Sequence, residues 1–60
     1  MDIKEMVRDT RERLGIKRKK FAGMMNVNES CIWRWENGQR TPDGPALILL
    51  SLIRKLHQMD

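Results

Sequence analysis

The spacing of hydrophobic and polar positions predicts a chain of four helices with no strand. Apolar residues recur three and four positions apart within four stretches, and short polar breaks separate these stretches. Asp2 is placed to cap the first helix, and Gly15 is placed to end it. The expected helices cover roughly residues 2–14, 17–25, 28–37 and 44–58.

Arg11 interrupts the apolar stripe of the first expected helix. It lies four residues after Val7 and three before Leu14, so we expect its side chain to point toward the core. A buried arginine needs a carboxylate partner, because burying an unpaired charge is costly. The pattern therefore predicts an acidic residue at a buried position elsewhere in the chain.

The third expected helix has one apolar side and one polar side. Asn28 is its predicted N-cap, and the structural residues Ile32 and Trp35 should face inward with Cys31 beside them. The residues left on the outer side are Glu29, Ser30, Trp33 and Arg34.

The last expected helix is apolar nearly all round over residues 46–53. Asp43 is its predicted N-cap, and Pro45 falls in the first turn, where proline is tolerated. A surface helix of a small domain normally has a single apolar stripe. We therefore expect one side to pack on the domain and the other to meet a second copy of the chain; core packing alone is the alternative. Its basic residues, Arg54 and Lys55, lie near its end, which disfavours a membrane-surface helix.

Length and composition limit the function classes further. Sixty residues correspond to a single domain, residues 1–60, with a small core. Cys31 and His57 are the only cysteine and the only histidine, so we expect no disulfide, metal site or cofactor. Neither an acid–base pair nor a nucleophile with its base is recognisable, so we expect no enzyme. A charged start and the lack of a long apolar run predict a cytoplasmic location with no membrane contact.

The balance of charge favours nucleic acid as the partner. The chain has 12 Lys and Arg against 8 Asp and Glu, a formal net charge of +4. Four consecutive cations, residues 17–20, stand at the start of the second helix, where the helix dipole is unfavourable for positive charge. A docked phosphate would remove this conflict, so Lys17, Arg18 and Lys19 are predicted phosphate contacts. A solvated face, or contact with a membrane or protein, is the alternative.

Residues 18–37 have the features of a helix-turn-helix motif. Two short helices are joined by a tight turn, and the small side chain of Ala22 allows them to cross closely. Asn26 suits the turn because asparagine tolerates the left-handed conformation. In such a motif the second helix, here about residues 28–37, is offered to the DNA major groove.

Several short runs resemble one family. They are Leu14-Gly15-Ile16, Phe21-Ala22, Val27 and the run from Ile32 to Gly38, which contains Trp-Glu-Asn-Gly. Together they resemble the bacterial and phage repressors of the Cro/C1, or XRE, type. The stretch from Arg40 to Leu47 is similar to HigA- and MqsA-type antitoxins. This resemblance implies an all-α, compact, lambda-repressor-like domain of four to five helices.

The resemblance also implies roles for individual residues. It makes Glu36 the partner of Arg11. The base-reading positions correspond to Glu29, Ser30, Trp33 and Arg34. The backbone-contacting positions correspond to Arg18, Asn28, Asn37, Gln39 and Arg40.

The chain departs from the family pattern at several of these positions. Lys17 and Arg18 replace the usual Ser or Thr and Gln, and Asn26 stands where Gly is common. Trp33 is unusually large for an exposed recognition position. It could stack on a sugar or a thymine methyl group, pack on a loop, or join a protein interface. Glu29 could accept from cytosine N4 or merely favour the helix N-terminus.

The sequence thus predicts a regulator that binds double-stranded DNA with sequence specificity. The expected form is a repressor that acts as a homodimer, through the last helix, on a palindromic operator. The alternative is an antitoxin-type interaction module that binds a cognate toxin or another protein and regulates its own operon.

Overall fold

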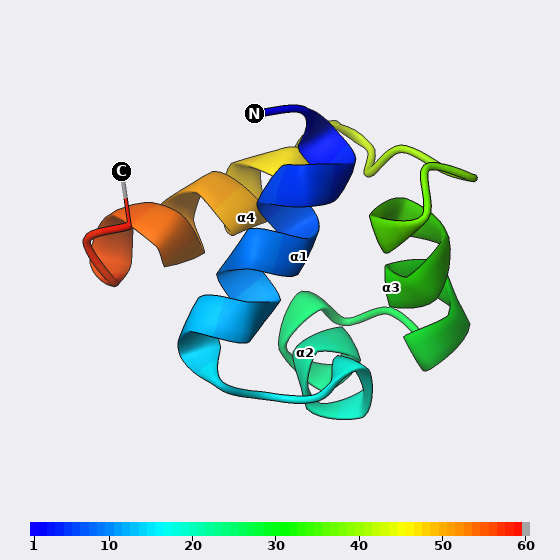
Figure 1. The fold of residues 1–60 in the computed structure, drawn as a ribbon, viewed down its shortest axis with the longest axis horizontal. Helices are drawn as coiled ribbons and strands as arrows, with labels where there is room; N and C mark the ends of the chain where they lie inside the picture. Colours follow the sequence, from blue (N-terminus) through cyan, green and yellow to red (C-terminus); the bar gives the residue numbers. More distant parts are fainter. Residues whose placement is uncertain (60) are drawn as a thin grey trace.

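The computed structural model describes residues 1–59, and this part of the chain forms four helices and no strand (Figure 1). The helices are α1 (Ile3–Leu14), α2 (Arg18–Met25), α3 (Glu29–Glu36) and α4 (Gly44–Leu56). The all-α prediction is confirmed, with helix ends that differ from the expected ones by a residue or two. The predicted domain extends to Asp60, which lies outside the described residues.

Three of the four helices begin with the predicted side-chain cap. Asp2, Asn28 and Asp43 each accept a hydrogen bond from the backbone N–H three residues ahead, at 2.9–3.0 Å. α2 differs, because Lys17 occupies its N-cap position and makes no capping hydrogen bond. The start of α2 therefore combines uncapped N–H groups with a run of cations.

The turn between α2 and α3 depends on Asn26. This residue has a φ of +58°, in the left-handed region that side chains rarely adopt. Its conformation ends α2 and lets the chain enter α3 after two further residues. The prediction of a sharp asparagine turn is confirmed.

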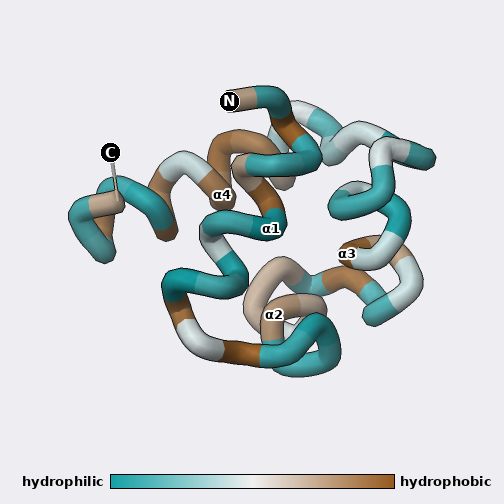
Figure 2. Tube along the Cα trace, viewed as in Figure 1, coloured by the Kyte–Doolittle hydropathy of each residue, from teal (hydrophilic) through white to brown (hydrophobic). Residues whose placement is uncertain are grey.

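A small core lies where the four helices meet. α1 lies between α4 and the α2–α3 pair in Figure 1, and Figure 2 shows hydrophobic residues along most of α4. The buried hydrophobic residues are Val7, Phe21, Ala22, Met25, Ile32, Trp35, Leu50 and Ile53. Cys31 and Leu49 are only partly buried and pack against this core, while Ile3 at the start of α1 is exposed.

Arg54 has an unexpected place in the core. It is only 3% exposed, and its Nη1 donates to Oδ2 of Asp9 at 2.9 Å and to Oγ1 of Thr10 at 2.8 Å. The sequence indicated only that Arg54 is a basic residue near the end of the last helix. Its burial arises because α4 packs its last turns against α1 and brings Arg54 to the side of an acid.

Candidate nucleic-acid interface

The rotation of α3 is set by its two largest buried side chains. Ile32 and Trp35 are buried in the core, three residues apart on one side of the helix. The opposite side consequently faces solvent. The four predicted base-reading residues are all exposed there: Glu29, Ser30, Trp33 and Arg34.

These four side chains share one hollow with two predicted phosphate contacts. The hollow has a volume of about 560 Å³. We call it the recognition hollow, and its lining residues are Arg18, Glu29, Ser30, Trp33, Arg34 and Gln39. A surface assembled from α2, α3 and the following loop can contact base edges and a flanking phosphate together.

A buried carboxylate is bound to Arg18, one of the residues that line the recognition hollow. Glu36 is 2% exposed, and its Oε2 accepts from Nε of Arg11 at 2.6 Å. Its Oε1 accepts from Nη2 of Arg11 at 3.1 Å and from Nε of Arg18 at 3.2 Å. The predicted pairing of Arg11 with Glu36 is therefore present, and Arg18 is a second partner.

Arg8 completes this cluster and was not foreseen from the sequence. Its Nη2 donates to the backbone oxygen of Glu36 at 3.2 Å, and its Nε lies 3.8 Å from Oε1 of the same residue. Arg8 precedes Arg11 by three positions, so the two share one side of α1. That spacing is the signal by which Arg8 could have been found.

The cluster places three guanidinium groups around one carboxylate. The hydrogen bonds that Arg11 donates to Glu36 raise the pKa of Arg11 above its ordinary value, so Arg11 stays charged. One negative charge cannot neutralise Arg8, Arg11 and Arg18, and Arg8 and Arg18 are partly exposed. The excess positive charge therefore lies on the side chains that reach the surface.

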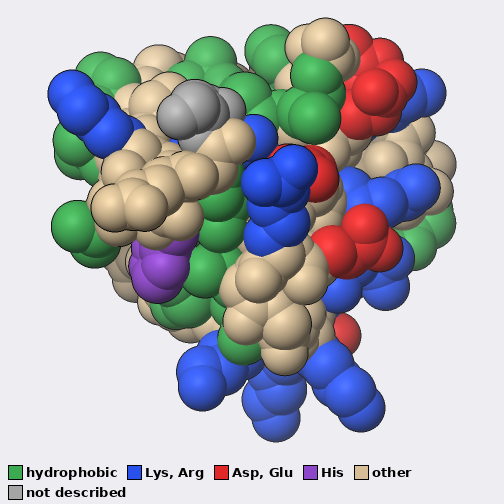
Figure 3. Space-filling view, turned by 60° about the vertical axis from the view of Figure 1, so that its left-hand side comes forward, with side chains coloured by type: hydrophobic (Ala, Val, Ile, Leu, Met, Phe, Trp, Pro, Cys, Tyr) green, Lys and Arg blue, Asp and Glu red, His purple; other side chains and the backbone are tan. Residues whose placement is uncertain are grey.

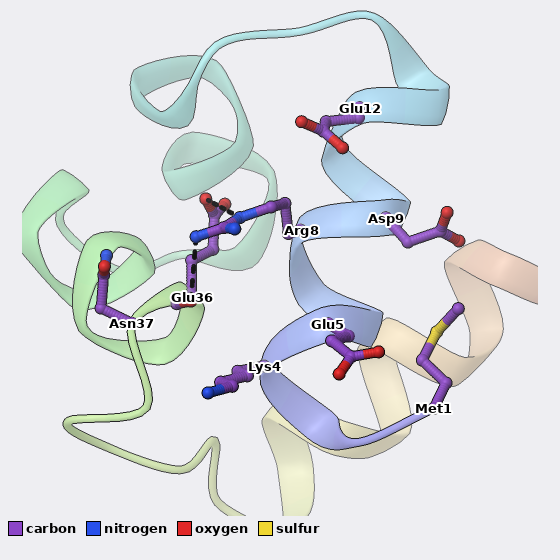
Figure 4. Close-up of a pocket in the computed structure, with 8 residues that line it drawn as sticks. All are labelled: Met1, Lys4, Glu5, Arg8, Asp9, Glu12, Glu36 and Asn37. Carbon is purple, nitrogen blue, oxygen red and sulfur yellow. Dashed lines mark hydrogen bonds and ion pairs between the residues drawn. The ribbon is translucent and has the colours of Figure 1, made fainter.

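A second hollow, of about 370 Å³, lies between α1 and the end of α3 (Figure 4). Arg8 bridges it toward Glu36, while side chains of both signs line the rest. Those side chains include Lys4, Glu5 and Glu12, none of which was predicted as a site residue. Its mixed charge makes it less suited than the recognition hollow to a polyanion.

The run of four cations, residues 17–20, lies at the start of α2. Lys17, Lys19 and Lys20 are exposed, and Figure 3 shows basic side chains projecting from the lower end of the molecule, where Figure 1 places this start. Of the four consecutive cations at residues 17–20, Arg18 bonds to Glu36 and lines the recognition hollow. The three lysines can contact an extended anion beside the hollow.

The predicted backbone contacts around α3 divide into two kinds. The side chains of Asn28 and Asn37 bond to α3 itself: Oδ1 of Asn28 accepts from Ser30, and Nδ2 of Asn37 donates to the oxygen of Trp33. Gln39 and Arg40 lie beyond the helix with exposed side chains. Their backbone N–H groups both donate to the oxygen of Arg34, which folds the loop back toward α3.

Residues 7–53 match a family model described as helix-turn-helix. The chain belongs to the helix-turn-helix family of the XRE, or Cro/C1, type. No curated protein and no solved structure matches it.

Membership of this family confirms the resemblance to the Cro/C1, or XRE, type and makes the chain a DNA-binding transcription regulator of that type. The family is a DNA-binding family and not an enzyme family. The similarity to antitoxins stays a prediction. Within residues 1–59, none of the helices has the length and apolar character that crossing a membrane requires.

Proposed function

We propose that this regulator is a repressor that binds a palindromic operator as a homodimer, with α3 in the major groove. The observation that carries the proposal is the recognition hollow, because it joins all the predicted base-reading residues to Arg18 and Gln39 on one face. In helix-turn-helix proteins the start of the second helix reads base edges and the first helix crosses the backbone. The proposed acting unit is one domain, residues 1–60, in the cytoplasm.

The proposed contacts follow from position and charge. Glu29, Ser30, Trp33 and Arg34 would meet base edges, since they share the exposed side of α3. The cations and amides around them would meet phosphates, which position the protein without reading sequence. The proposed phosphate contacts are Lys17, Arg18, Lys19, Asn28, Asn37, Gln39 and Arg40.

The proposed dimer uses the exposed side of α4. Ile48, Leu52 and Leu56 are large, exposed hydrophobic residues four positions apart, so they form one stripe on the helix. Two copies related by a two-fold axis would cover this stripe with the same stripe of the partner. Such a dimer would present two copies of α3 to half-sites about 34 Å apart, one turn of DNA.

The stripe also supports the alternative function of an antitoxin-type module, because a toxin could cover the same three side chains. The two functions differ in what the purified chain does alone. A repressor of the proposed kind forms a dimer and binds its operator without another protein. An antitoxin-type module leaves this side of α4 uncovered until its toxin is present.

Selection of bound sites from random DNA, followed by titration of stoichiometry, tests the proposed function. We expect an enriched sequence made of two inverted half-sites, bound by two copies of the chain. Enrichment of a single unrepeated site, bound by one copy, would contradict the dimer. Failure to enrich any sequence would contradict sequence-specific binding.

A further inference from the structure

One large apolar side chain lies among the charged and polar side chains of the recognition hollow. Trp33 is 43% exposed, while buried Ile32 and Trp35 hold α3 in a rotation that keeps Trp33 outside the core. Single exposed hydrophobic residues are common and need no function. Trp33 differs from such residues because it lines a concave surface together with Arg18 and Arg34.

The backbone that carries this indole is held in place. The oxygen of Trp33 accepts two hydrogen bonds from Asn37, one from its backbone N–H at 3.0 Å and one from Nδ2 at 2.8 Å. Tryptophan has only two side-chain torsions, so little freedom is lost when it is covered. Trp33 is thus an apolar side chain on a well-held backbone, within a hollow whose other lining side chains are charged or polar.

The chemistry of the major groove limits which groups of the base edges an apolar side chain can contact. The groove edges of the four base pairs carry hydrogen-bond donors and acceptors, and the C5-methyl group of thymine is their apolar feature. We propose that Trp33 reads a thymine in each half-site by covering its C5-methyl group with the indole. This inference rests on the proposed operator binding and names the base that one of its residues recognises.

Geometry also limits where this thymine lies. Trp33 and Arg34 are consecutive and line the same hollow. Their Cα atoms are about 3.8 Å apart, close to the rise of about 3.4 Å per base pair. The thymine should therefore lie within about two base pairs of the base that Arg34 contacts.

Replacing thymine by deoxyuridine tests the proposal, since the only change is the loss of the methyl group. Each thymine of the selected operator is replaced in turn and the affinity is measured. For the wild-type chain we expect one position per half-site at which replacement weakens binding about fourfold, the factor for one buried methyl group. Trp33→Ala should bind thymine and uracil operators equally at that position.

Two further variants separate thymine reading from general effects. Trp33→Phe keeps an apolar ring and should keep a preference for thymine at the same position. Met24→Ala is the matched control, because Met24 is also 43% exposed but lies on α2 and does not line the hollow. This control should keep the full wild-type preference. Circular dichroism confirms that each variant remains helical.

Failure of the inference and failure of the proposed function give different results. If an operator is selected but no thymine can be distinguished from uracil, the inference is wrong and the proposed function stands. The same holds if Trp33→Ala keeps the wild-type preference, or if it alters self-association alone. If random DNA gives no enriched sequence, the proposed function fails and the inference falls with it.

Discussion

Nε of Arg18 lies 3.2 Å from Oε1 of Glu36, which ties a cation of the recognition hollow to a carboxylate buried in the core. A surface arginine usually samples many conformations and loses this freedom on binding. Arg18 has already lost part of this conformational freedom, because it donates to Glu36. Glu36 is in turn held in place by Arg11. The core ion pair thus helps to orient a side chain that is proposed to contact DNA.

Arg18→Ala should weaken binding to all DNA sequences alike. Removing one phosphate contact leaves base preference intact and makes the dependence of log affinity on log salt shallower by about one unit per subunit. Titrations of operator and random DNA between about 50 and 200 mM salt measure both effects. Lys55→Ala is the control, because it removes one exposed positive charge from α4, away from the hollow. An unchanged slope for Arg18→Ala would contradict the phosphate contact.

Arg11→Met should destabilise the fold by at least about 1.5–3 kcal/mol, the range for one lost hydrogen bond to a charged group, because it removes two such bonds to Glu36. The loss should stay below the roughly 3–5 kcal/mol that breaking an isolated buried pair costs. The reason is that Arg18 remains within 3.2 Å of Glu36 and partly compensates its charge. Urea unfolding of the wild type and the variant measures the difference.

The double variant Arg11→Met with Glu36→Leu checks the cause of that loss. Removing both members of the buried pair leaves an apolar contact, and the partly exposed Arg8 and Arg18 can turn to solvent. The double variant should therefore recover part of the stability lost by Arg11→Met. A harmless Arg11→Met would show that the pair does not support the fold.

Local signals explain why the helices and most of the candidate site were predictable. Asp2, Asn28 and Asp43 act through backbone groups three residues away, so their role can be read from neighbouring positions. The outward side of α3 follows from the spacing of Ile32 and Trp35 in the same way.

Contacts between distant parts of the chain were less predictable. Arg54 meets Asp9 and Thr10 across more than forty residues, and only the packing angle of α4 on α1 creates that contact. Thr10 lies three residues after Val7 in α1, and nothing near it in the sequence indicates that its hydroxyl accepts from Arg54. The link from Arg18 to Glu36 was missed for the same reason, because it depends on how α2 crosses α3.

Leu52→Lys should weaken operator binding while each copy stays helical. Leu52 is 57% exposed on the apolar stripe of α4, so a lysine there would place two like charges close together at the two-fold axis. Sedimentation measures association, and circular dichroism measures helicity. Leu49 is a poorer choice because it packs against the core. Ser51→Lys is the control, since Ser51 is exposed on the same helix but off the stripe. Equal effects of the two variants would contradict the proposed interface.

Asp9 should make stability depend on pH in acid. The hydrogen bond from Arg54 holds the pKa of Asp9 below its ordinary value of 3.8, with further help from Arg13. A carboxylate with a lowered pKa in the folded state stabilises the fold above its ordinary pKa, and this contribution is lost as the pH falls through the lowered value. Asp9→Asn should thus cost stability at neutral pH, and the difference from the wild type should shrink below about pH 4. Urea unfolding across this range checks it, and a constant difference would be contrary to the expected ionisation.

Arg34→Lys tests whether the proposed base-reading arginine recognises a guanine. Arg34 is exposed and lines the recognition hollow, and the rotation of α3 directs it away from the core. The planar guanidinium can donate two parallel hydrogen bonds to O6 and N7 of guanine. Lysine keeps the charge but lacks this fork. The variant should keep much of its affinity for random DNA and lose about 1–3 kcal/mol of discrimination at one base pair per half-site.

Arg34→Ala separates base reading from phosphate contact. If Arg34 reads a guanine, site selection with this variant should lose the preference at one base pair of each half-site and keep the others. If Arg34 only contacts a phosphate, affinity should fall equally for operator and random DNA, and the selected sequence should stay the same. The second result would move Arg34 to the positioning contacts. Glu29, Ser30 and Trp33 would then carry the specificity, because they are the other exposed α3 side chains that line the hollow.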